Sequence, residues 1–546
     1  MHIAYASDNG GNVRKRRLII GSVLVAGALA LTGCASGDDK ASSGSDSGVI
    51  RVWNSEPQNP LVPGDTNEAG GGFVLDNLFA GLIYYDAKGA PHNDVAESIT
   101  TDDGQNYDIK LKSGQKFSNG EAVTASSFVD AWNFTAQLSN KQKLMDFFQN
   151  IVGYDEEKDS ELTGLKVVSD TEFTVALKTK VADFGQRLGT NAFFPLPKSA
   201  VEDIKAFGEN PVGNGPYKFK NATAWKHNEQ LELVANDEYT GARKAKNSGV
   251  TFVVYNDLDS AYKDVQSGNL DVLYQIPDSA AGTYKSDFPD TNANEPAAIQ
   301  QSFTIPQNLA HFSGAEGALR REAISLSINR PEITKVIFHG TRAPSTDFSA
   351  PTIAGFQKDL DGSEVFSYNP KKAKELWAQA DAIAPWSGTF TLAYNADSGH
   401  QGWVDAVCNN IKNALGIEAQ GAPVPTFSQL RDQIVNRSIG GAFRSGWQGD
   451  YPGLYNFLGP VFSTNGSSND GDYSSPEFDA LLQKGITESD TTAANKDFAQ
   501  AQQVLFTDLP QISLWYQNVT AVWDGGIKDV AFSWNSYPIL TDIVKN

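Results

Sequence analysis

The chain has 546 residues, of which 40% are apolar and 11% are aromatic, and its formal net charge at pH 7 is −21. A chain of this length exceeds what one hydrophobic core supports, so we expect two or three globular domains rather than one domain or a disordered chain. The acidic balance argues against nucleic acid or an anionic membrane surface as a partner, and it favours solubility outside the cell.

The first segment predicts where the protein is located. Basic residues from Arg14 to Arg17 precede an apolar run from Leu18 to Leu31, which is typical of a secretory signal peptide and is too short to span a bilayer. Leu31-Thr32-Gly33-Cys34 resembles the lipobox of bacterial lipoproteins, in which the cysteine becomes the lipid-modified first residue. An ordinary short anchor with an incidental cysteine is the alternative. We expect a signal peptide over residues 1–33, lipidation of Cys34, and a flexible Gly- and Ser-rich tether over 34–47.

Strand and helix patterns alternate through the rest of the chain. Alternating or β-branched runs predict strands over 48–53, 107–111, 172–177, 217–219, 231–234, 250–255, 268–274, 389–394 and 512–516. Apolar residues at helical spacing predict helices over 124–134, 200–207, 258–267, 319–326, 403–416, 476–485 and 498–505. A further helix follows Gly72 and reaches Leu82, and another begins at Pro331. This alternation predicts an α/β protein of several lobes.

Two local features of these segments matter for function. The Gly-rich run from Asn67 to Gly72 can bring backbone close to a ligand, and its edge could pair with an extended ligand backbone. Cys408 lies on the apolar side of a helical pattern and has no partner for an internal disulfide once Cys34 is lipidated. We therefore expect Cys408 to be a small buried hydrophobic residue.

The stretch from Arg444 to Asp450 places a cation, the indole of Trp447 and a carboxylate within seven residues, and turn-forming residues follow. Charges of both signs beside a stacking surface suit a zwitterionic ligand. The alternative is a strand end and an Asx turn, with Trp447 in the core and Asp450 bonded to its own backbone.

Common enzymatic signals are missing from the sequence. It contains no Gly-x-Ser-x-Gly elbow, no His-Glu-x-x-His and no phosphate-binding loop, and its six histidines are scattered. We therefore expect no metal and no cofactor. A secreted carbohydrate-active enzyme remains the alternative of another class, because acidic, aromatic-rich extracellular proteins often cleave sugars with paired carboxylates.

Several short motifs occur in the order that one known family has them. The motifs are Phe117-Ser118-Asn119-Gly120, Gly213-Asn214-Gly215-Pro216-Tyr217, Asn236-Asp237-Glu238-Tyr239, Leu319-Arg320-Arg321-Glu322-Ala323 and Tyr473-Ser474-Ser475-Pro476-Glu477-Phe478-Asp479. Together they make the chain resemble the extracytoplasmic solute-binding proteins of the ABC-transporter peptide/nickel family, and the oligopeptide-binding lipoproteins most closely.

This resemblance implies a type II periplasmic-binding-protein fold, in which two α/β lobes enclose the ligand and an extra domain sits on the first lobe. By the family pattern, lobe I comprises residues 48–83, 212–300 and 518–546. The extra domain comprises residues 84–211, and lobe II comprises residues 301–517.

The resemblance also implies roles for five side chains. Asp450 matches a carboxylate that holds the peptide's α-amino group, and Trp447 has the family's spacing from it. Arg444 and His400 match residues that can meet the ligand's carboxylate. Tyr274 matches an aromatic residue of the first lobe that faces the peptide. The chain departs from some members at Gln448, where those members have a disulfide brace beside the carboxylate.

The implied function is an extracytoplasmic substrate-binding lipoprotein of an ABC importer. Such a protein captures oligopeptides between its lobes and delivers them to a membrane permease. We expect a monomer without enzymatic activity or nucleic-acid partner, held by Cys34 on the outer face of the bacterial cytoplasmic membrane. Oligosaccharide, nickel or haem remain alternative ligands of the same fold.

Overall fold

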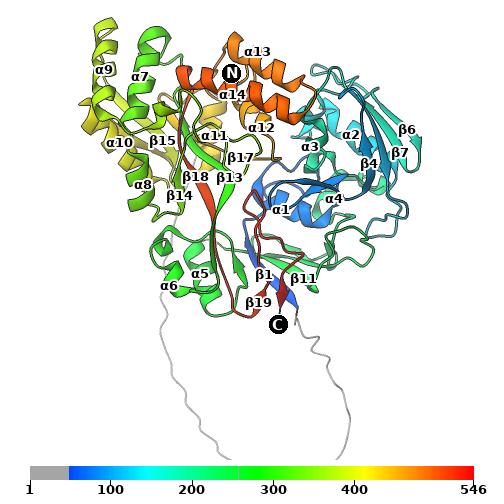
Figure 1. Ribbon diagram of the computed structural model, residues 1–546. Helices are drawn as coiled ribbons and strands as arrows, with labels where there is room; N and C mark the ends of the chain where they lie inside the picture. The colour runs from blue at the N-terminus through cyan, green and yellow to red at the C-terminus, as the bar shows by residue number, and fades with distance from the viewer. Residues whose placement is uncertain (1–47, 256, 546) are drawn as a thin grey trace, which may run out of the picture. The chain divides into compact units, whose positions relative to one another are not determined.

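The structure is a computed structural model that describes residues 48–255 and 257–545 (Figure 1). The predicted signal peptide, the tether and Cys34 lie outside the described residues. In the described part of the chain, none of the helices has the length and apolarity that a membrane crossing requires.

A mixed twelve-stranded sheet is the largest element of the structure. Its main path runs in the order β16-β15-β17-β13-β18-β12-β1-β11-β10-β8, while β14 pairs with β18 and β9 pairs with β10. The strands are β1 (Val49–Asn54), β8 (Tyr217–Phe219), β9 (Trp225–Lys226), β10 (Gln230–Ala235), β11 (Gly249–Val254), β12 (Val272–Leu273), β13 (Asn292–Thr304), β14 (Arg342–Pro344), β15 (Thr389–Asn395), β16 (Glu418–Val424), β17 (Ala442–Gln448) and β18 (Gln511–Trp523).

The antiparallel strands β13 and β18, each 13 residues long, join the two ends of this sheet. One half of the pair lies beside β12, and the other half lies beside β17. Their register shifts between Pro296 and Gln300, at a proline that cannot donate a ladder hydrogen bond. Because such irregularities bend a strand, this shift marks where the pair can flex.

A separate four-stranded antiparallel sheet forms from residues between β1 and β8, in the order β4-β5-β7-β6. Its strands are β4 (Ala96–Thr100), β5 (Asn106–Leu111), β6 (Leu165–Ser169) and β7 (Glu172–Ala176). In β5 the buried residues are Tyr107, Ile109 and Leu111, as period-2 alternation predicts. The helix α2 (Ala125–Ala136) begins with a capping box at Thr124 and packs Trp132 against Phe173 of β7. Figure 1 shows α2, β4, β6 and β7 gathered together.

Most of the longer helices follow β13 in the chain, and Figure 1 shows α7 to α10 beside β15. They are α7 (Gly314–Ser327), α8 (Arg330–Val336), α9 (Pro370–Ile383), α10 (Gln401–Leu415), α11 (Phe427–Val435), α12 (Leu454–Phe462), α13 (Pro476–Ile486) and α14 (Thr491–Asp508). The helix α10 ends at Gly416, whose φ of 72° is the left-handed conformation that glycine allows. Cys408 on α10 is buried, as predicted, and this burial raises the pKa of its thiol to about 12.

Apart from single-turn 3₁₀ helices, the other helices and strands are α1 (Ala69–Leu78), α3 (Phe184–Arg187), α4 (Ile204–Glu209), α5 (Leu258–Gln266), α6 (Tyr284–Asp287), β2 (Ile83–Tyr85), β3 (Pro91–Asn93), β19 (Ile527–Lys528) and β20 (Val544–Lys545). Two predictions need correction. Residues Ala69 to Gly72 form the first turn of α1, so they offer no strand edge to a ligand. The predicted strand over 268–274 is reduced to the two residues of β12.

Candidate ligand-binding cavity

A cavity of about 390 Å³ lies among segments that are far apart in the sequence. Its lining residues fall within 66–77, 81–85, 144–147, 189–194, 446–450 and 533–541, together with Arg243. The C-terminal end of β17 and the loop that follows it lie across this cavity from the first turns of α1. Trp447 and Asp450 both line this cavity, so the structure brings these two predicted site residues together.

The strand β17 presents an edge beside this cavity. It pairs with β13 from Phe443 to Gln448, whereas on its other side it pairs with β15 only through Ala442 and Phe443. Among the described residues, no strand pairs with that second edge beyond Phe443. Gly446, Trp447 and Gln448 line the cavity. This edge therefore leaves backbone groups available to an extended ligand.

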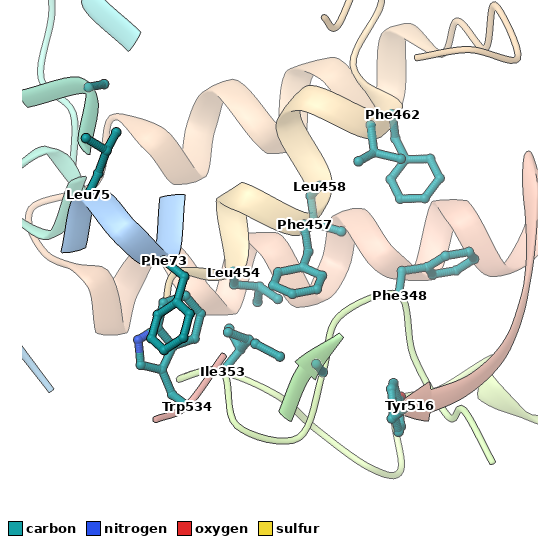
Figure 2. Close-up of a cluster of buried hydrophobic side chains, with 14 of the residues drawn as sticks. Phe73, Leu75, Phe348, Ile353, Leu454, Phe457, Leu458, Phe462, Tyr516 and Trp534 are labelled. Carbon is teal, nitrogen blue, oxygen red and sulfur yellow. The ribbon is translucent and has the colours of Figure 1, made fainter. Parts of the chain in front are cut away.

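Tight packing fixes the turn that follows β17. A Cβ atom at Gly449 would lie 2.8 Å from the Trp534 ring and 3.1 Å from the Phe457 ring, so only glycine fits without a shift. Figure 2 shows Leu454 and Phe457 of α12 beside Ile353, with Phe73 and Trp534 on the side of α1. The loop that carries Asp450 is thus supported from behind by a hydrophobic cluster.

Asn456, in the first turn of α12, organises the predicted site. Its side-chain amide donates a hydrogen bond to Asp450 Oδ2 at 2.8 Å. Its carbonyl oxygen accepts from the Asp450 backbone N–H at 2.9 Å and from Trp447 Nε1 at 3.1 Å. The Asp450 carboxylate is therefore bonded to Asn456 and not to its own backbone, unlike the Asx-turn alternative. No sequence pattern predicts the role of Asn456, because that role depends on the turn that brings α12 back to β17.

The cavity is electrically negative. The Asp450 side chain is exposed, but desolvation by the surrounding protein raises the pKa of its carboxyl, and the hydrogen bond from Asn456 opposes this rise. Burial raises the pKa of Asp76 on α1 to about 6, although the charge of Arg243 opposes the rise. Glu68 is a third lining carboxylate. A cavity with this lining favours a cationic group.

Arg444 and His400 lie near each other, but neither lines this cavity. Arg444 Nε donates to Asn395 Oδ1 at 2.6 Å, and its guanidinium lies 5.0 Å from the centre of the Phe427 ring. Burial lowers the pKa of Arg444 to about 10, which leaves it charged at neutral pH. Burial and the charge of Arg444 lower the pKa of His400 to about 3, so the imidazole is neutral. Its Nδ1 accepts a hydrogen bond from Trp403 Nε1.

Tyr274 lies behind the cavity wall rather than in it. Its side chain is buried, and its hydroxyl donates to Asn54 Oδ1 at 3.1 Å. Its ring centre is 5.6 Å from that of Phe73, which does line the cavity. The structure thus places Tyr274 where it supports a lining residue.

Across residues 48–255 and 257–545, no three or more His, Cys, Asp or Glu residues come together in a group that could hold a metal ion.

Known proteins resemble this chain in sequence and in structure. The family model for bacterial extracellular solute-binding proteins, family 5 Middle, matches residues 90–469, which is more than half of the chain. The chain is 27% identical to the oligopeptide-binding protein OppA of Bacillus subtilis, over 94% of this chain and 97% of that protein. It is similar in structure to Haemophilus influenzae OppA in complex with RPPGFSPFR, with a TM-score of 0.77 at 21% identity over 91% of this chain and 98% of the other. It is also similar to NikZ from Campylobacter jejuni in complex with Ni(L-His), with a TM-score of 0.75 at 18% identity over 92% and 100% of the two chains.

These likenesses confirm the predicted type II periplasmic-binding-protein fold. They also contradict the alternative prediction of a carbohydrate-active enzyme. The chain belongs to the bacterial extracellular solute-binding proteins of family 5, the peptide/nickel family of ABC-transporter binding proteins, and it is a binding protein rather than an enzyme.

Proposed function

We propose that the protein captures oligopeptides in this cavity and delivers them to an ABC permease. The observation that carries the proposal is the Asp450 carboxylate, which lines the cavity, has one hydrogen-bond donor from the protein and lies beside Trp447. A peptide's α-ammonium supplies the charge and the donors that this carboxylate lacks. An uncharged sugar bound over the carboxylate would take it out of water without supplying a cation, which is unfavourable.

The edge of β17 provides a place for the peptide backbone. An extended ligand would add to this edge as a further strand, with its amino end toward Asp450. Arg444 and Gln448 are four residues apart on this strand, which corresponds to about 13 Å of edge. Arg444 carries a positive charge at the far end and is the candidate partner for the ligand's carboxylate. The neutral His400 beside it could donate a hydrogen bond but no charge.

We further propose that lobe I consists of residues 48–83, 212–300 and 518–546, with the extra domain at 84–211 and lobe II at 301–517. Closure would then be a hinge motion at the register shift in the β13–β18 pair. Two hydrogen bonds join the loop after Asp450 to the extra domain. Tyr451 donates to Asp183 Oδ2 at 2.6 Å, and Gln186 Nε2 donates to the Pro452 carbonyl at 3.1 Å. Opening would break both bonds.

The proposed location is supported by the sequence of the first segment. We propose that the signal peptide over 1–33 is removed, that Cys34 is lipidated, and that the tether over 34–47 holds a monomeric binding protein on the outer face of the cytoplasmic membrane. Replacing Cys34 with alanine should release the protein from membranes into the medium or the soluble extracytoplasmic fraction. Retention of the variant on membranes would contradict lipid anchoring.

Native mass spectrometry tests the ligand class directly. Protein purified without added ligand should carry a distribution of small masses that fragment as peptides with free amino ends. Co-purified sugars, a nickel complex or haem would overturn the assignment to peptides while leaving the family unchanged.

A further inference from the structure

Four charged side chains line the cavity, namely those of Glu68, Asp76, Arg243 and Asp450. Their contacts decide which of them are available to a ligand. Glu68 and Arg243 are hydrogen-bonded to other parts of the protein, and the Asp450 carboxylate accepts one hydrogen bond from Asn456. The Asp76 carboxylate has no hydrogen-bond or ion-pair partner among the described residues.

Glu68 and Arg243 are engaged in holding the fold. Glu68 caps the N-terminus of α1, because its carboxylate accepts the Gly71 N–H at 2.9 Å and 3.1 Å. Arg243 Nε donates to Asp94 Oδ2 at 3.1 Å, and its other nitrogens donate to the backbone carbonyls of Asp76 and Phe79. The charge of Arg243 is thereby paired with Asp94, whose side chain is 1% exposed.

Asp76 differs from both. Its carboxylate makes no hydrogen bond and no ion pair with any residue in the described ranges 48–255 and 257–545, although its side chain is partly buried and lines the cavity. Burial raises its pKa to about 6, so the group is mainly ionised at pH 7. The charge of Arg243 opposes this rise, but a partly buried carboxylate that accepts no hydrogen bond is still costly to the ligand-free protein.

Asp76 and Asp450 act on the same surroundings. Besides burial, the negative charges of both carboxylates raise the pKa of Tyr85 and of Tyr537, two rings of the cavity lining. Both carboxylates line the same cavity, Asp76 from α1 and Asp450 from the loop after β17. The α-ammonium of a peptide carries one positive charge, so it satisfies only one of them.

On the basis of the proposed function, we propose that Asp76 recognises a cationic side chain on the first residue of the peptide, so that peptides beginning with lysine or arginine are preferred. Such a residue carries its two positive charges at the ends of a flexible apolar stem, and it can present one charge to Asp450 and the other to Asp76. The rings of Tyr85 and Trp534 in the lining provide apolar surface for the stem.

Competition between two tetrapeptide pools tests this proposal. The pools share mixed residues at positions two to four and begin either with lysine or with norleucine, whose stem is the same length but uncharged. Native mass spectrometry of the purified full chain measures the ratio of bound pools. We expect the lysine pool to bind at least tenfold more tightly to the wild type. Asp76→Asn should reduce this preference to less than threefold, and binding of the norleucine pool by the variant shows that it is folded.

The matched control is Asp102→Asn, which removes the same charge at an exposed position outside the cavity and should leave the preference unchanged. Equal binding of the two pools to the wild type, or a lysine preference that survives in Asp76→Asn, would overturn the role of Asp76 and leave peptide capture intact. If neither pool binds the wild type, the proposed function fails and the inference fails with it.

Discussion

Replacing Asp450 with asparagine should separate peptide affinity from stability. Asparagine has nearly the same shape and keeps an oxygen that can accept the hydrogen bond from Asn456, so the loop should keep its geometry. What is lost is the negative charge that faces the ammonium. Removing one partner of an enclosed charge pair costs about 2–5 kcal/mol. Since about 1.4 kcal/mol corresponds to a tenfold change in Kd, we expect Asp450→Asn to weaken peptide binding by well over tenfold.

The same variant should have the opposite effect on the ligand-free protein. Desolvation by the surrounding protein raises the pKa of Asp450, so the ionised carboxylate destabilises the folded state at neutral pH, and asparagine removes that effect. Calorimetric titration with a free-ended peptide and thermal unfolding without ligand measure the two effects, with Asp102→Asn as the control. Unchanged peptide affinity in Asp450→Asn would refute the reasoning, because the cavity would then hold the peptide without this charge.

Three further predictions concern the surroundings of the site. Asn456→Ala removes the hydrogen bonds to Trp447 and Asp450, so it should lower the free energy of unfolding in urea by about 1–3 kcal/mol and weaken peptide binding about tenfold. An unchanged unfolding free energy together with an unchanged peptide affinity would show that Asn456 does not organise the loop. Tyr451→Phe removes the buried hydrogen bond to Asp183 and should cost about 1.5–3 kcal/mol of unfolding free energy, whereas an unaltered urea midpoint would contradict its role. Asp76 has a folded-state pKa of about 6, above its unfolded value of about 3.9, so its ionisation lowers stability as pH rises through this window. Ligand-free Asp76→Asn should therefore match the wild type near pH 4 and gain up to about 3 kcal/mol by pH 8, and a gain that does not grow with pH would count against an enclosed carboxylate.

Local signals in the sequence predicted much of the secondary structure. The strand at Val49–Asn54, the capped start of α2 after Thr124 and the end of α10 at Gly416 all depend on neighbouring residues, and the structure confirms them. The strand β13 was not predicted, because Pro296 interrupts it and it lacks clear alternation. It becomes a strand through pairing with β17 and β18, which are distant in the sequence.

In the candidate site, too, some features depend on neighbouring residues and others on the tertiary structure. Trp447 and Asp450 lie in one short stretch, so their proximity was readable before the fold was known. Asp76 reads as an ordinary polar residue in a helix, and Trp534 belongs to a segment near the C-terminus. Only the tertiary structure brings both residues to the cavity that contains Asp450. Sequence patterns do not reveal which charged side chains lack a partner in the folded protein. Tertiary packing decides this, as it does when it brings Asp94 to Arg243 and Asn456 to Asp450.

In the proposed complex, the Asp450 carboxylate holds the amino end of the captured peptide. Comparing one peptide in its free and N-acetylated forms tests it most directly, because acetylation removes the positive charge and little else. Calorimetry on the wild-type protein should show that acetylation weakens binding at least tenfold, and that this difference largely disappears in Asp450→Asn. Equal affinity of the two forms for the wild type would contradict the account.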